Sequence, residues 1–140
     1  MDRDKDIADG GCLCGAIRFQ AVGAEKGAGY CHCESCRRHT GAPVVAFVVY
    51  GADQVRWLKG DRTRYQSSPA KFRSFCGACG ASLTFEDCSG GGTALVEFHI
   101  SAMDNPNAFP PNEHTHEAER ISWLALSDDL PRYRGSMRID

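Results

Sequence analysis

The spacing of the cysteines constrains this chain more than any other feature. Eight cysteines occur in 140 residues, and seven of them form three groups: C-x-C at 12–14, C-x-C-x-x-C at 31–36 and C-x-x-C at 76–79. Cysteines two residues apart are too close to bridge easily to each other. The N-terminal stretch MDRDKDIADGG is charged and has no apolar signal region. We therefore expect a reducing, cytoplasmic setting, where clustered cysteines indicate metal or redox chemistry rather than a disulfide framework.

Length and composition are those of an ordinary globular domain. The 140 residues are 42% hydrophobic and 24% charged, which is enough for one domain with its own core. No run of about 18 apolar residues occurs, so no membrane span is expected. A net charge of −2 does not favour a nucleic-acid partner. We predict a flexible leader over 1–10, a single domain over 11–135 and a tail over 136–140.

Short apolar segments separated by turn signals predict a mainly β fold. Ile17, Phe19 and Ala21 alternate with polar residues, as in a half-buried strand. The run VVAFVVY at 44–50 is rich in β-branched and aromatic residues. The stretch ESCRRHT at 34–40 is the one helix candidate. Two short strands are predicted on either side of Gly60-Asp61, the second at 63–68. A hairpin is predicted from 81–87 and 93–100, a long loop at 101–114 and a last strand at 120–126.

Two of the cysteine groups can together form a closed zinc site. Cys76 and Cys79, followed by Gly80, have the spacing of a zinc knuckle, a tight turn that lets both sulfurs converge. Cys12 and Cys14 lie two residues apart, so in an extended chain both side chains face the same side. Four thiolates leave no position for a substrate, so this pairing predicts a structural zinc.

The remaining group, Cys31, Cys33 and Cys36, supplies three ligands and leaves a fourth position for water or substrate, as in catalytic zinc sites. Because it lacks one protein bond, we expect this second zinc to be the more labile. Two alternatives stay open. The C-x-x-C pairs at 33–36 and 76–79 could form a single ribbon-like site, or the lone Cys88 or a histidine could close the three-cysteine site. Taken by itself, Cys88 is expected to be a surface or half-buried thiol.

Four segments in order, GGCLCGAIRF, YCHCESCRRHTGAP, TRYQSSPAKFRSFCGACGASL and RISWLALSDDLPRY, resemble the glutathione-dependent formaldehyde-activating enzyme family, which includes centromere protein V. The resemblance extends from Gly11 to Tyr133. It implies a single-domain, zinc-bound β-tent of short antiparallel strands. It also implies a structural zinc on Cys12, Cys14, Cys76 and Cys79, and a second, open zinc on Cys31, Cys33 and Cys36.

The resemblance further implies a carbon–sulfur lyase that joins glutathione, or another small thiol, to formaldehyde or another small aldehyde. Zinc favours the deprotonated form of a thiol, so the open position could capture the sulfur as a thiolate. His32 and His39 are candidates for moving the proton, because histidine titrates near neutral pH. Arg37, Arg38 and Arg73 are candidates for binding substrate carboxylates.

Each of these residues also has a simpler interpretation. His32 alternates with two ligands, so in an extended segment it points away from the metal. Arg37 and Arg38 can form a solvated face. His114 and His116 fall in a loop, where a surface position is expected. The alternative function is a non-catalytic zinc module that binds a partner or a small thiol, because a fold alone does not fix an activity.

Overall fold

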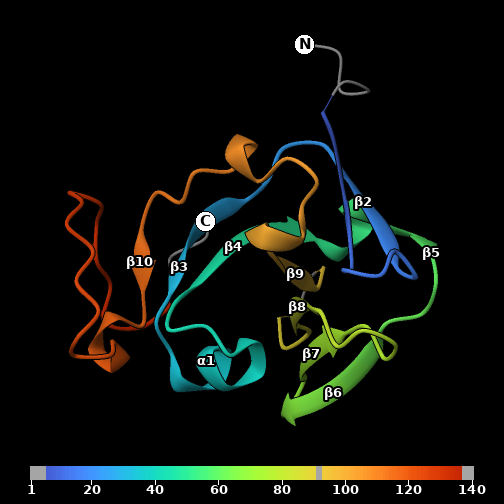
Figure 1. The fold of residues 1–140 in the computed structure, drawn as a ribbon. Coiled ribbons are helices and arrows are strands. Elements are labelled where there is room, and N and C mark those ends of the chain that lie inside the picture. The colour runs from blue at the N-terminus through green and yellow to red at the C-terminus, as the bar shows by residue number, and fades with distance from the viewer. Residues whose placement is uncertain (1–5, 91–92, 137–140) are drawn as a thin grey trace.

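The computed structural model describes residues 6–90 and 93–136, and within these ranges ten strands form two sheets (Figure 1). A three-stranded sheet has the order β1-β2-β5, and a seven-stranded sheet has the order β10-β3-β4-β9-β8-β7-β6. The mainly β prediction is confirmed. The strands are β1 (Ile7–Gly11), β2 (Arg18–Val22), β3 (Gly27–Cys31), β4 (Val45–Gly51), β5 (Val55–Lys59), β6 (Thr63–Ser68), β7 (Lys71–Phe75), β8 (Ser82–Asp87), β9 (Leu95–His99) and β10 (His114–Thr115).

The position of each strand explains its residue pattern. Strand β4 lies between β3 and β9, and its β-branched run is buried on both faces. The predicted hairpin at 81–100 is confirmed, because β8 and β9 pair antiparallel with Thr84 opposite Phe98. The pairs within both sheets are antiparallel, except that the two-residue strand β10 runs parallel to β3. The predicted long loop at 101–114 therefore ends by joining the larger sheet.

Aromatic side chains hold the two sheets together. Phe19 of β2 and Phe98 of β9 are fully buried, and their rings stack with centroids 4.1 Å apart. Trp57 of β5 meets the Phe19 ring edge-on at 5.6 Å. Such pairs add to the free energy gained by burying the rings. The main core thus lies between the smaller sheet and the middle of the larger one.

Helix α1 (Glu34–Thr40) has the bounds that the sequence predicts. Its N-cap is Cys33, which is extended and whose sulfur accepts a hydrogen bond from the backbone N–H of Cys36 at 3.3 Å. The helix ends at Gly41, whose φ of 74° is left-handed and suits glycine. The cap therefore brings two cysteines of the same group together within one helical turn.

Two predictions about secondary structure are wrong. Residues 7–10 do not belong to a flexible leader, because β1 pairs with β2 from Ile7 onward, and residues 1–5 of that prediction lie outside the described residues. The segment 120–126 is not a strand, and its Trp123 is 71% exposed. The backbone carbonyls of this segment accept hydrogen bonds from arginine side chains, and not from a neighbouring strand. Arg120 donates to the Leu124 carbonyl at 2.6 Å and Arg132 to the Leu126 carbonyl at 2.8 Å.

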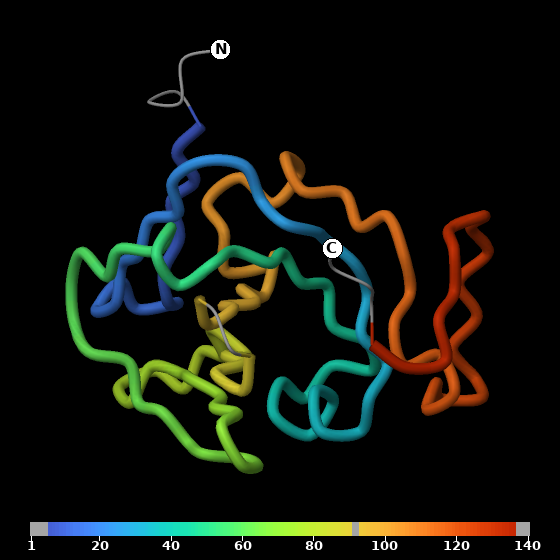
Figure 2. Tube along the Cα trace, turned by 180° about the vertical axis from the view of Figure 1, so that it is seen from behind, coloured from blue at the N-terminus to red at the C-terminus, as the bar shows by residue number. Residues whose placement is uncertain are grey.

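The chain after β10 lies at one end of the molecule beside β3, and the three-stranded sheet lies at the other end (Figure 2). The chain returns to β10, where the backbone N–H of Tyr133 donates to the His114 carbonyl at 2.8 Å. Helices in the described ranges are all too short and too polar to span a bilayer.

Candidate metal centres

Four cysteine sulfurs from distant parts of the chain converge beside the core. Those of Cys12, Cys14, Cys76 and Cys79 all lie within 4.8 Å of one another. The sulfurs of Cys12 and Cys14 are 3.6 Å apart, and those of Cys14 and Cys76 are 3.9 Å apart. Tetrahedral zinc with bonds of about 2.3 Å would separate its sulfurs by about 3.8 Å. The donor set therefore fits zinc, with shifts of no more than about 1 Å between sulfurs.

Backbone N–H groups point at this four-thiol group, as a metal-binding knuckle requires. The Ile17 N–H donates to the Cys12 sulfur at 3.2 Å, and the Ala78 N–H donates to the Cys76 sulfur at 3.4 Å. Gly80 closes the turn with a φ of 78°, and its N–H donates to the Cys76 carbonyl at 2.8 Å. Hydrogen bonds from the backbone, led by that of Ala81, lower the pKa of Cys79 to about 6. The turn thus favours thiolates before any ion is considered.

A second group consists of three thiols at the start of α1. Cys31 ends β3, Cys33 caps the helix and Cys36 lies in its first turn, and their sulfurs lie within 4.8 Å of one another. Hydrogen bonds from the thiols of Cys31 and Cys36 lower the pKa of Cys33 to about 2. Hydrogen bonding to Cys33 raises the pKa of Cys31. One thiolate held by two thiols is a preformed anionic pocket that suits a cation.

Within residues 6–90 and 93–136, no histidine, carboxylate or further cysteine joins this three-thiol group. Cys88 is an exposed thiol beyond the end of β8. The ribbon-like alternative is wrong, because the sulfurs of Cys33 and Cys36 gather with Cys31 and not with the pair at 76–79. Among the described residues, this group therefore has three sulfur ligands and no fourth.

The three candidate arginines have different surroundings. Arg73 of β7 is buried, its Nη1 donates to the Cys36 sulfur at 3.5 Å, and its guanidinium lies over the Phe85 ring at 4.8 Å. Arg37 donates to the backbone carbonyls of His32 and Glu119. Arg38 is exposed and pairs with Glu34 at 2.8 Å. Of the three arginines, only Arg73 has a side chain that contacts a candidate zinc ligand, Cys36.

The buried His99 and the half-buried His39 lie together near the end of the helix. The rings of His39 and His99 are 5.5 Å apart. His39 Nε2 and His99 Nδ1 are buried and have no hydrogen-bond partner among the described residues. Burial lowers the pKa of both, that of His99 to about 4, so both are neutral at pH 7. His99 also lines a cleft of about 750 Å³ bordered by Thr40, Ser82 and Asp104.

His32 points away from the three thiols, as strand alternation predicts. Its Nε2 lies 2.8 Å from His114 Nδ1 and 3.3 Å from a carboxylate oxygen of Glu117. The expected surface position of His114 is wrong, because this side chain is fully buried. Strand β10 carries it into the sheet. Local sequence could not show this, since the contact joins positions 82 residues apart.

Comparisons with known proteins show which family the chain belongs to. A profile of the glutathione-dependent formaldehyde-activating enzyme family matches residues 7–119. The chain therefore belongs to this family of cysteine-rich β proteins. An uncharacterized lyase of Schizosaccharomyces pombe is 35% identical over 82 residues, which are 59% of this chain and 59% of that protein. The match therefore spans less than two thirds of the yeast protein.

A solved structure of a Rhodobacter sphaeroides protein has a similar fold. It superposes with a TM-score of 0.54 at 19% identity, covering 89% of this chain and 98% of the other. At this identity the similarity concerns the fold alone.

Proposed function

We propose that this protein is a zinc-dependent carbon–sulfur lyase that forms or cleaves an S-hydroxymethyl thiol adduct at Cys31, Cys33 and Cys36. The observation that carries the proposal is the group of three convergent sulfurs with no fourth protein ligand among the described residues. The family match and the lyase name of the yeast relative support the reaction class. Glutathione and formaldehyde are the proposed substrates, following the family description. A reducing cytoplasm, which keeps thiols free, is part of the same proposal.

The two cysteine groups would have different roles. Cys12, Cys14, Cys76 and Cys79 would hold a structural zinc, because four thiolates complete its coordination. Cys31, Cys33 and Cys36 would hold a second zinc, which when bound supplies a positive charge that favours the thiolate form of an incoming thiol. The reaction then needs a carbon–sulfur bond between that sulfur and the aldehyde carbon. It also moves one proton from the sulfur to the aldehyde oxygen.

Arg73 is the proposed electrostatic partner of this site. Three thiolates and one divalent ion have a net charge of −1, which is costly to bury unless a positive group is near. The Arg73 guanidinium lies beside Cys36 and is fixed against Phe85. Arg37 and Arg38 are bound to backbone carbonyls and to Glu34, so they are weaker candidates for holding a substrate carboxylate.

His39 is the better proposed proton carrier. It lies one helical turn after Cys36, and the Ser74 backbone holds it by a hydrogen bond. Its Nε2 is a free acceptor in the neutral ring, so it can take a proton from a thiol and return it to the new hydroxyl. His32 faces His114 and Glu117 instead, so a direct role for it is not proposed.

The test is the exchange rate between free glutathione, formaldehyde and their adduct, measured by NMR exchange spectroscopy with zinc-loaded protein. We expect the wild type to accelerate exchange and Cys36→Ser to lose the acceleration by more than ~100-fold, because a metal site of this kind supplies several kcal/mol. Cys88→Ser is the matched control, since this exposed thiol lies outside both groups, and should retain the wild-type rate.

Two results would overturn the proposal. Full activity in Cys36→Ser would place the chemistry elsewhere. Exchange at the uncatalysed rate with zinc-loaded wild type would favour the alternative function, a non-catalytic zinc module that binds a partner or a small thiol.

A further inference from the structure

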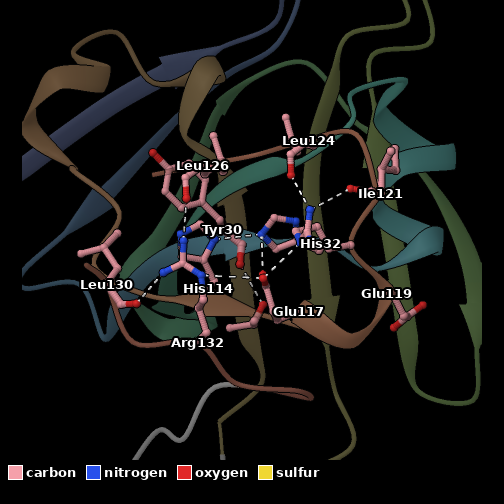
Figure 3. Close-up of polar contacts among 12 residues, drawn as sticks. Tyr30, His32, His114, Glu117, Glu119, Ile121, Leu124, Leu126, Leu130 and Arg132 are labelled. Atoms are coloured by element: carbon pink, nitrogen blue, oxygen red, sulfur yellow. Dashed lines mark hydrogen bonds and ion pairs between the residues drawn. The ribbon is translucent and has the colours of Figure 1, made fainter. Parts of the chain in front are cut away.

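We propose that His32, His114 and Glu117 form a third metal site, for a divalent transition-metal ion, separate from both cysteine groups. The ligand atoms would be His32 Nε2, His114 Nδ1 and a carboxylate oxygen of Glu117, Oε2. All three lie within 4.8 Å of one another. Figure 3 shows both imidazole rings and the carboxylate directed at one point, from the residue that follows β3, from β10 and from the 3-10 helix Glu117–Glu119.

The spacing of these atoms is close to that of a metal site. His32 Nε2 is 2.8 Å from His114 Nδ1 and 3.3 Å from Glu117 Oε2. Tetrahedral zinc with bonds of about 2.0–2.1 Å separates its nitrogen and oxygen ligands by about 3.3 Å. An ion would therefore require the two rings to part by about half an ångström, and Glu117 Oε2, which lies within 4.8 Å of His114 Nδ1, to approach that nitrogen. Two histidines and one glutamate are also the donor set of several catalytic zinc sites.

The outer contacts orient His114 and Glu117 as metal sites require. His114 Nε2 lies 3.1 and 3.0 Å from the two carboxylate oxygens of Asp128, so its proton belongs on that nitrogen. Nδ1 then presents its lone pair towards His32 and Glu117, the arrangement common in metal-bound histidines. The other oxygen of Glu117, Oε1, pairs with Arg120 at 3.3 Å and Arg132 at 3.7 Å. These pairs leave Oε2 for the ion.

A hydrogen-bonded chain from Asp128 through His114 to His32 is the competing interpretation. It satisfies the facing nitrogens, but it leaves the buried Glu117 Oε2 without a hydrogen-bond partner among the described residues. Buried polar atoms in that condition are uncommon and costly. An ion at this point would engage Glu117 Oε2 directly.

There is also room for further ligands, and the site is separate from the thiols. A cavity of about 250 Å³ is lined by His32, His114, Glu117, Arg120 and Arg132. Its two arginines balance the charges of Glu117 and Asp128, so an ion would not enter an already positive pocket. His32 alternates with Cys31 and Cys33 and so faces the opposite side of the chain. Nitrogen and oxygen donors also select Zn²⁺, Co²⁺ or Ni²⁺ over the softer ions that thiolates prefer.

The test is a zinc titration of the full, reduced chain labelled with ¹⁵N in histidine, followed by long-range imidazole NMR correlations and by metal analysis after gel filtration. We expect the resonances of His32 Nε2 and His114 Nδ1 to move to metal-bound values, while those of His39 and His99 stay in place. His114→Ala should lose one ion per chain. Glu117→Gln should lower the affinity for that ion by at least ~10-fold.

The matched control is His116→Ala, a neighbouring, partly exposed histidine outside the cluster, which should retain every ion. Because the nuclear resonances are read in the wild type, the test stands even where His114→Ala fails to fold. The proposal is overturned if both nitrogens keep the resonances of a hydrogen-bonded pair with excess zinc. Equal metal content in wild type, His114→Ala and Glu117→Gln would also overturn it.

Discussion

The Nη1 of Arg73 lies 3.5 Å from the sulfur of Cys36, and the same guanidinium rests on the ring of Phe85 at 4.8 Å. This contact joins β7, the strand next to the β6 edge of the larger sheet, to the first turn of α1. It places a fixed positive charge beside one of three convergent thiols in a buried setting. The electrostatics of the proposed open site can therefore be tested by changing a residue that is not a ligand.

Replacing Arg73 with methionine should weaken zinc binding at the three-thiol group by about 10-fold at pH 7, because Cys36 loses a partner that favours its thiolate. Affinity is measured by competition with a chromophoric chelator. Arg73→Lys keeps the charge and should recover part of the affinity. Unchanged zinc affinity in Arg73→Met would show that the contact has no electrostatic role.

Cys76→Ser and Cys36→Ser should differ in stability. Cys76 is buried where β7 ends and belongs to the four-thiol group, whose zinc would contribute directly to folding. We expect Cys76→Ser to lose cooperative thermal unfolding, while Cys36→Ser still unfolds cooperatively. Circular dichroism melting curves decide between these outcomes. A cooperatively melting Cys76→Ser protein would contradict the structural-zinc assignment.

Glu86 of β8 forms a buried ion-pair network that should contribute strongly to stability. Its carboxylate accepts two hydrogen bonds from Arg62, both at 2.9 Å, and lies 3.2 Å from Arg64. Arg62→Met should lower the free energy of unfolding by about 3 kcal/mol, because it breaks the bidentate pair of a buried carboxylate. Arg64 is more exposed, so Arg64→Met serves as the control and should cost less than about 1 kcal/mol. The free energies of unfolding are measured by urea denaturation, and equal losses in Arg62→Met and Arg64→Met would contradict this prediction.

His99 should make the fold less stable in mild acid. Burial lowers its pKa from 6.5 to about 4, and the positive charges of His39 and Arg73 act in the same direction. Below pH 6.5, His99 therefore binds a proton in the unfolded chain but stays neutral in the folded protein until the pH nears 4. The contribution of His99 to the free energy of unfolding is therefore fully present above pH 6.5. It falls by up to about 3 kcal/mol as the pH falls towards 4.

The measurement compares urea denaturation of wild type and His99→Gln at pH 7 and pH 4.5. Loss of metal in acid affects both proteins, so only the difference between them reports on His99. The wild type should lose more stability than the variant. Parallel losses would mean that His99 does not contribute.

The parts of the fold with local signals could be predicted from sequence. Helix α1 is confirmed with its bounds, because the capping cysteine and Gly41 lie next to it. The grouping of the pair at 12–14 with the pair at 76–79 agrees with the structure, because turn geometry and ligand count allow few other solutions. Strand β1 was missed, since its Asp9, Gly10 and Gly11 have no strand-like pattern and depend on pairing with β2.

The site residues that depend on long-range contacts could not be predicted. The burial of His114 is set by the parallel pairing of β10 with β3. The segment 120–126 has the apolar residues of a strand, but the guanidinium groups of Arg120 and Arg132 bind its carbonyls. A local pattern shows which residues are apolar. It does not show which groups will form hydrogen bonds with their backbone N–H and C=O groups.

The most direct test of the central claim, an open fourth position at Cys31, Cys33 and Cys36, uses protein loaded with cobalt in place of zinc. Glutathione is titrated in while the sulfur-to-cobalt charge-transfer bands are recorded, with S-methylglutathione as the control that has no free thiol. We predict a saturable gain in charge-transfer intensity with glutathione, none with S-methylglutathione, and none in Cys36→Ser, because an open tetrahedral position accepts one more sulfur. A spectrum that glutathione leaves unchanged in the wild type would contradict the account, because the position would then be closed to the thiol.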